Sequence, residues 1–201
     1  EARNTYRKEF SSGKATNIGG QVKSINKLAG HANEVADAAA NMDNLGAGGY
    51  GAIARPINKL GNALYTTPGA GLKRAADLYN NELSTYVSGK GGSGVEERKQ
   101  RSEAFDPNAT PQEMGQTLLT DIAFIKKQIE GNEQQRNGLF KNPKKQQEFQ
   151  LASPEAMQQL HQAEVKAHKL LGDFDQWSQT PEGQGAAGTV NTMKRPGGLP
   201  P

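Results

Sequence analysis

The sequence contains no cysteine, which excludes disulfide bonds, thiolate metal sites and a cysteine nucleophile. It contains no apolar run that approaches the roughly 18 consecutive residues of a membrane helix. The first residues also lack the charged-then-apolar pattern of a secretory signal. Alternating runs of β-branched residues are almost absent, so strands are not expected. Because strand patterns are almost absent, we predict an all-α fold.

Large apolar residues are scarce. Leu, Ile, Val and Phe together make up about 17% of the 201 residues, below the roughly 20% at which disorder becomes a serious alternative. The net charge is only +3, from 24 basic and 21 acidic residues, so self-repulsion would not expand the chain. We therefore expect several amphipathic helices with flexible Gly-rich linkers and extended polar termini. We expect the fold to be elongated and completed by partner subunits.

Apolar residues recur at spacings of three and four in four segments, which places them on narrow helical seams. The seams predict helices over residues 18–45, 72–86, 111–137 and 153–177. The third helix opens with a capping-box signature, Thr110 and Glu113 flanking Pro111. Residues 56–65 and 95–105 are expected to form two further helices.

Seams this narrow suit helix pairing, either within the chain or between copies. An ordinary small helical bundle without an interaction role is the simpler alternative. The residues that we expect at a partner interface are Ile25, Leu28, Val35, Met42, Leu72, Tyr79, Leu83, Tyr86, Leu118, Ile122, Ile125 and Ile129.

Glycine-rich and polar segments suggest five regions. The segment SGKGGSG at residues 88–94 is a flexible linker by composition. The expected regions are a polar N-terminal arm at 1–16, a helical unit at 17–88, a Gly/Ser linker at 89–94, a second helical unit at 95–177 and an extended Gly/Pro-rich tail at 178–201.

No arrangement of residues indicates an enzyme. The glycine-rich segments lack the strand and the Gly-Lys-Ser/Thr ending of a phosphate-binding loop. His161, Glu164 and His168 share a predicted helix face and have the residue types of a metal site. No matching ligand pair occurs on another helix, so we interpret them as a polar flank. We expect no catalytic residue, cofactor or metal.

One locally basic run stands out, Lys141, Lys144 and Lys145 around Pro143. Such a short cluster is usually plain surface, but it is also the best candidate for a phosphate contact. It supports a second hypothesis, in which the chain is a nucleic-acid-associated packaging or scaffold protein that also uses Lys194 and Arg195. Binding through phosphates would weaken by orders of magnitude as salt rises, whereas assembly through apolar seams would not.

The order of elements resembles a helical module of structural and DNA-ejection proteins of short-tailed bacteriophages. The resemblance covers residues 18–140. It lies in an Asn- and Ala-rich helix containing INKLAGH at 25–31, a Gly-broken stretch, YNNEL at 79–83, a flexible Gly segment, the helix at 96–105, and NATPQEM at 108–114 leading into Leu118 and Leu119.

The resemblance implies a non-enzymatic internal virion protein, or its C-terminal part, located near the portal and tail. Its implied partners are sister subunits, other portal, tail or ejection proteins, and packaged DNA. It would reach the host cell envelope after ejection, and contact a membrane only then. A protein that leaves through a narrow channel must unfold easily and regain structure by association.

Overall fold

The computed structural model describes residues 1–14, 16–45, 68–88, 105 and 109–184. The described residues form helices and no strand, which confirms the all-α prediction. The elements are α1 (Ala2–Ser11), α2 (Ile18–Leu45), α4 (Pro68–Ser88), α6 (Pro111–Leu139), α7 (Pro143–Gln147), α8 (Pro154–Leu171) and α9 (Phe174–Trp177). None of these helices is long and apolar enough to cross a membrane.

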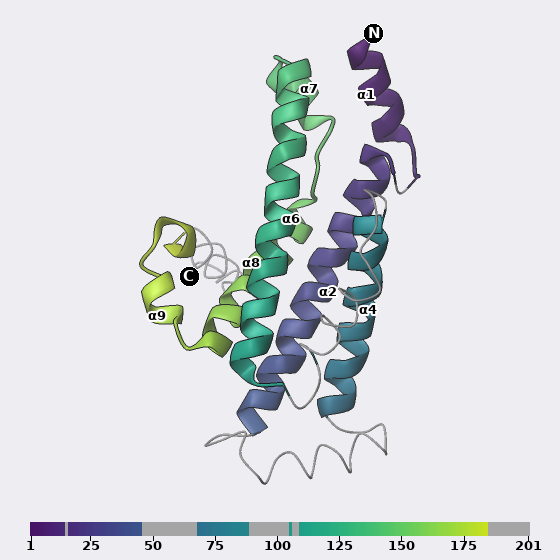
Figure 1. The fold of residues 1–201 in the computed structure, drawn as a ribbon. Coiled ribbons are helices and arrows are strands. Elements are labelled where there is room, and N and C mark those ends of the chain that lie inside the picture. The colour runs from purple at the N-terminus through teal and green to yellow at the C-terminus, as the bar shows by residue number, and fades with distance from the viewer. Residues whose placement is uncertain (15, 46–67, 89–104, 106–108, 185–201) are drawn as a thin grey trace, which may run out of the picture.

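Four long helices, α2, α4, α6 and α8, form the body of the molecule (Figure 1). Helix α2 packs most extensively against α4 and α8, and α6 packs mainly against α8. The predicted helices at 18–45, 72–86 and 111–137 correspond to α2, α4 and α6. The predicted helix at 56–65 lies outside the described residues, as does the helix at 95–105 except for Phe105.

The start of α6 has the predicted capping box. The Thr110 hydroxyl accepts a hydrogen bond from the Glu113 N–H at 3.2 Å, and the Glu113 carboxylate accepts one from the Thr110 N–H at 2.7 Å. Two backbone donors that a helix leaves unpaired are thereby satisfied. Pro111 occupies the first turn, where its missing N–H is not needed. Local chemistry therefore marks where this helix begins.

Helix α8 ends earlier than its seam predicts. It begins with Ser153 as its cap but ends at Leu171, because Gly172 has a φ of +79°. The Gly172 and Asp173 N–H groups both donate to the His168 carbonyl, at 3.1 and 3.2 Å, which closes the helix end. The prediction of one helix through Trp177 is therefore wrong. Trp177 belongs to α9, which turns back so that the Trp177 ring stacks on His168 with 4.2 Å between ring centroids.

The described parts of the two expected helical units share one core. Helix α2 of the first unit contacts α8 of the second along its length. The Asn26 side chain accepts a hydrogen bond from the Ser153 N–H at 2.9 Å, and Lys166 pairs with Asp37 at 2.6 Å. The described parts of the two predicted units therefore pack against each other, and the linker at 89–94 itself lies outside the described residues.

Both expected polar termini contain folded structure. Most of the predicted N-terminal arm is helix α1, whose Tyr6 is only 2% exposed. In the described part of the predicted tail, residues 178–184, the Thr180 hydroxyl donates to the Trp177 carbonyl and accepts from the Gly183 N–H. This part folds back against α9 and is not extended. The remainder of the tail lies outside the described residues.

Candidate functional site

A basic groove of about 500 Å³ lies between α1 and the turn that joins α6 to α7. Figure 1 shows α1 and α7 at the same end of the molecule. Two segments more than 130 residues apart in the sequence supply its cations, and no described lining residue is acidic. The lining residues are Arg3, Asn4, Arg7, Phe140, Lys141, Asn142 and Lys145.

Aromatic packing holds α1 in place beside this turn. The Tyr6 ring lies edge-on to Phe140 and Phe149, with 5.6 Å between centroids in both pairs, and Phe10 contacts Phe149 at 5.1 Å. Such pairs contribute about 1 kcal/mol each beyond the burial of their surface. Burial raises the pKa of Tyr6, although the positive charge of Arg136 acts against that rise. The cluster of Tyr6, Phe10, Phe140 and Phe149 is called the aromatic clasp below.

The turn itself is fixed by polar contacts. The Asn142 side chain caps α7 by accepting from the Lys144 N–H at 2.9 Å, and Pro143 occupies the first turn of α7. The Gln146 amide donates to the Phe140 carbonyl at 2.6 Å. Arg3 joins α1 to this turn, because its Nε donates to the Leu139 carbonyl at 2.8 Å. That bond uses one of the five N–H donors of a guanidinium.

Two of the three lysines that we predicted as a phosphate contact line the groove. Lys141 and Lys145 line the groove with exposed side chains, whereas Lys144 is exposed but is not among the residues that line it. Arg3 and Arg7 were missed because the segment at 1–16 was interpreted as a polar arm. Their spacing of four residues was a signal, since it places both on one face of a helix. Their meeting with Lys141 depends on long-range packing and has no local signature.

No protein-family model, curated protein or solved structure matches the chain. Function must therefore be inferred from the residues and their geometry.

The predicted partner interface is corrected by the burial of its side chains. Eleven of its twelve residues are no more than 6% exposed, and they pack in the core of this chain. The narrow seams thus pair with one another within the chain. The side chain of Met42 lies outside the described structure. The corrected residues are Ile25, Leu28, Val35, Leu72, Tyr79, Leu83, Tyr86, Leu118, Ile122, Ile125 and Ile129.

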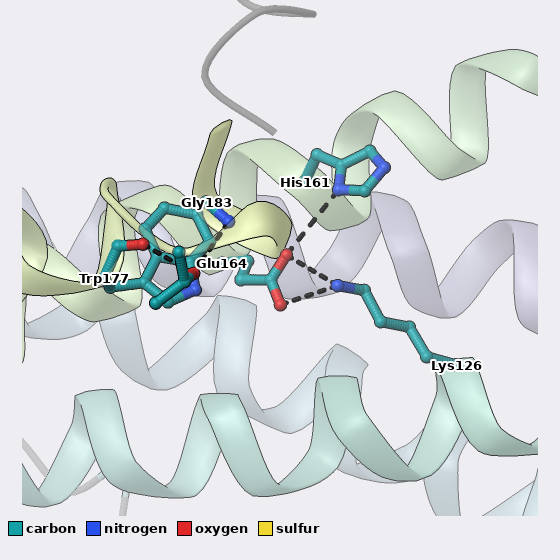
Figure 2. A network of polar contacts seen from close by, with 6 residues as sticks. Lys126, His161, Glu164, Trp177 and Gly183 are labelled. Atoms are coloured by element: carbon teal, nitrogen blue, oxygen red, sulfur yellow. Dashed lines mark hydrogen bonds and ion pairs between the residues drawn. The ribbon is translucent and has the colours of Figure 1, made fainter. Parts of the chain in front are cut away.

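His161, Glu164 and His168, which have the residue types of a metal site, lie in ion pairs and hydrogen bonds with other side chains. Figure 2 shows the Glu164 carboxylate between Lys126 of α6 and His161 of α8. Lys126 Nζ lies 2.6 Å from both carboxylate oxygens, and His161 Nδ1 lies 3.6 Å from one of them. His168 contacts Asp173 at 2.8 Å instead. No group of three or more potential metal ligands occurs in the described part of the chain.

The Lys126–Glu164 pair connects α6 to α8, and it makes the stability of the fold depend on pH. Burial acts to raise the pKa of Glu164, but the contacts with His161 and Lys126 and their positive charges outweigh it, so the pKa is lowered from 4.5. A lowered folded-state pKa stabilises the fold above the ordinary glutamate value, and this contribution is lost as pH falls through the folded-state pKa.

Replacing Glu164 by Gln is expected to lower the free energy of unfolding by about 2 kcal/mol at neutral pH, because Lys126 loses its charged acceptor. The loss should shrink as the pH falls below the ordinary glutamate range. Urea unfolding at a series of pH values measures both effects. Glu130→Gln, at an exposed position of α6, is the matched control. A Glu164→Gln protein with the pH dependence of the unchanged chain would contradict this role.

Two helical carboxylates, those of Asp77 and Glu82, each lie beside a lysine. Asp77 is 3.7 Å from Lys73 on the exposed side of α4, and Glu82 is 3.6 Å from Lys27. An ion pair within α4 accounts for Asp77, and one between α2 and α4 accounts for Glu82, without a catalytic role. The basic groove is therefore the feature on which a functional proposal is best based.

Proposed function

We propose that the chain is a non-enzymatic structural protein of a tailed-phage virion, an internal or DNA-ejection protein or the C-terminal part of one. It assembles at the portal and tail channel with sister subunits and other virion proteins. The observation that carries the proposal is the gathering of four cations at one end of an all-helical bundle. A protein stored beside packaged DNA faces a dense array of phosphates, which such a surface attracts. The resemblance of residues 18–140 to phage ejection proteins supports the same assignment.

Burial of the seams constrains how such a protein assembles. While the bundle is closed, neighbours meet only its outer faces, where Leu78 at 44% exposure is the one large apolar side chain that is exposed among the described residues. Passage through a tail channel requires the helices to separate. The seams that close the bundle are then free to pair between copies, and association restores the buried apolar surface. The proposed location is accordingly the virion near the portal, and the host cell envelope after ejection.

The test is the protein content of purified particles before and after triggered DNA release. Quantitative mass spectrometry of a phage that encodes the tagged chain should find it in mature particles, and should find it depleted from emptied ones. The major capsid protein, retained in both, is the internal control. Absence of the chain from mature particles would refute the proposal.

The basic groove also favours a second candidate, a nucleic-acid-associated packaging or scaffold protein. A scaffold acts during assembly and leaves before the particle matures. The same measurement on immature particles separates the two candidates, because a scaffold is present in them and missing from mature particles.

A further inference from the structure

We propose that the basic groove binds the phosphates of a nucleic-acid backbone, and that it does so only while α1 is docked through the aromatic clasp. The inference goes beyond the proposed function, because it assigns a ligand to a defined site. It holds whether or not the chain is packaged in a virion.

The charge of the groove argues for a phosphate ligand. Arg3 and Arg7 come from α1, Lys141 and Lys145 come from the other side, and all four side chains are exposed. Two amides, those of Asn4 and Asn142, stand in the same lining. Arginine donates a planar fork that matches phosphate oxygens, and lysine adds a compact charge. Four cations without a carboxylate among the described lining residues leave the positive potential of the groove uncompensated.

The surface around the groove argues for nucleic acid over a lipid membrane. Proteins that bind membrane surfaces usually combine basic residues with apolar side chains that enter the lipid. Phe140, the aromatic residue in the lining, is only 3% exposed, so it has little surface to insert. Leu78, the exposed large apolar side chain of the described residues, lies on α4 and does not line the groove. Backbone phosphates require only the cations.

The position of α1 argues that binding depends on its docking. One flank of the helix supplies Arg3 and Arg7 to the basic groove, while Glu1 and Glu9 line a separate pocket between α1 and the end of α6. Only one orientation of α1 therefore directs its cations toward Lys141 and Lys145. The aromatic clasp and the bond from Arg3 to the Leu139 carbonyl fix that orientation. Detachment of α1 would remove two of the four cations from the groove without changing the net charge of the chain.

The experiment measures binding of the full chain to a short duplex DNA by fluorescence anisotropy over a range of salt concentrations. Each phosphate contact contributes about 0.9 to the slope of log affinity against log salt. The double substitution Arg3→Gln and Arg7→Gln should therefore lower the slope by about 1.8. It should weaken binding roughly fiftyfold at about 0.1 M salt. Lys73→Gln with Arg74→Gln, two exposed positions on α4, removes the same charge away from the groove and should change binding far less.

A third variant tests the docking of α1 separately from charge. Tyr6→Ala removes the ring at the centre of the aromatic clasp but retains every cation, and it should lower affinity and slope almost as much as the double arginine variant. Tyr6→Phe retains the ring and loses a hydroxyl that has no hydrogen-bond partner among the described residues, so it should bind like the unchanged chain. Circular dichroism of each variant verifies that the four long helices remain folded.

Three results would overturn the inference. Equal binding by the arginine and the α4 double variants would show that net charge, and not the groove, attracts DNA. Unchanged binding by Tyr6→Ala would show that α1 need not dock. Binding to phosphatidylglycerol vesicles without binding to DNA would assign the groove to a membrane surface. None of these results depends on whether the chain is found in virions, so this inference and the proposed function can fail independently.

Discussion

Replacing Ile122 by Asp is expected to unfold the isolated chain. Ile122 has no exposed surface and lies in the core of the bundle. A carboxylate at that position must be buried without a partner or must open the helices to water. The expected loss is about 4 kcal/mol or more, a large share of the 5–15 kcal/mol that stabilises a typical domain. Circular dichroism during urea titration should show loss of the cooperative transition.

The matched control is Ala123→Asp, one position further along α6, where the side chain is exposed. It should change the free energy of unfolding by no more than about 0.5 kcal/mol. A partner interface at Ile122 predicts a different pair of results, because both variants would then remain folded and only Ile122→Asp would fail to assemble. A folded, soluble Ile122→Asp chain would therefore contradict the packing described above.

Replacing Gly19 by Ala is expected to destabilise the fold by about 3 kcal/mol. Gly19 lies in the first turn of α2, where the backbone at the end of α1 approaches it closely. An added Cβ would overlap the carbonyl oxygens of Phe10 and Ser12. These are backbone atoms, so the clash can be relieved only by moving α1 away from α2. The variant should therefore also weaken DNA binding, since α1 would lose its place beside the groove.

Gly131→Ala is the control, and its expected effect on the free energy of unfolding has the opposite sign. Nothing lies within 4 Å of a Cβ added at Gly131 in α6. Alanine is favoured over glycine inside helices, so this variant should gain about 0.5–1 kcal/mol. Thermal unfolding of the two proteins under the same conditions measures the contrast. A stabilising effect of Gly19→Ala would show that the backbone at the end of α1 does not approach Gly19 as closely as described.

Much of the helical structure could be predicted because its signals are local. The capping box at Thr110 and Glu113 sets the start of α6, and the seam from Ile25 onwards identifies α2. The end of α8 also had a local signal, since glycine is common just beyond helix ends. The prediction overlooked Gly172 because Phe174 and Trp177 continued the spacing of the seam, although they belong to the next helix.

The amount of core was underestimated for a compositional reason. Counting only Leu, Ile, Val and Phe leaves out alanines that are fully covered, among them Ala29, Ala32 and Ala36 on α2. Small residues on this helix let neighbouring backbones approach closely, so narrow seams suffice to close a bundle. The choice between pairing within the chain and pairing between copies has no sequence signal, because the same apolar stripe serves both.

The candidate site was only half predictable. Lys141 and Lys145 stand close together in the sequence, and their clustering was visible there. Arg3 and Arg7 reach the same groove only because Tyr6 packs on Phe140 and Phe149. Aromatic residues so far apart in the sequence carry no sign of their mutual contact. The groove is thus a product of tertiary structure, and a single sequence reveals only its local part.

The stacking of Trp177 on His168 gives the protein an internal optical probe. Trp177 is the only tryptophan of the chain. It lies in α9, which follows α8, far in sequence from α2 and α4. Its fluorescence therefore monitors the docking of α9 and the histidine beside it, while far-ultraviolet dichroism monitors all the helices. If the denaturation curves from the two signals coincide, α9 unfolds together with the core. A fluorescence change at a lower denaturant concentration than the dichroism change would mean that α9 detaches first.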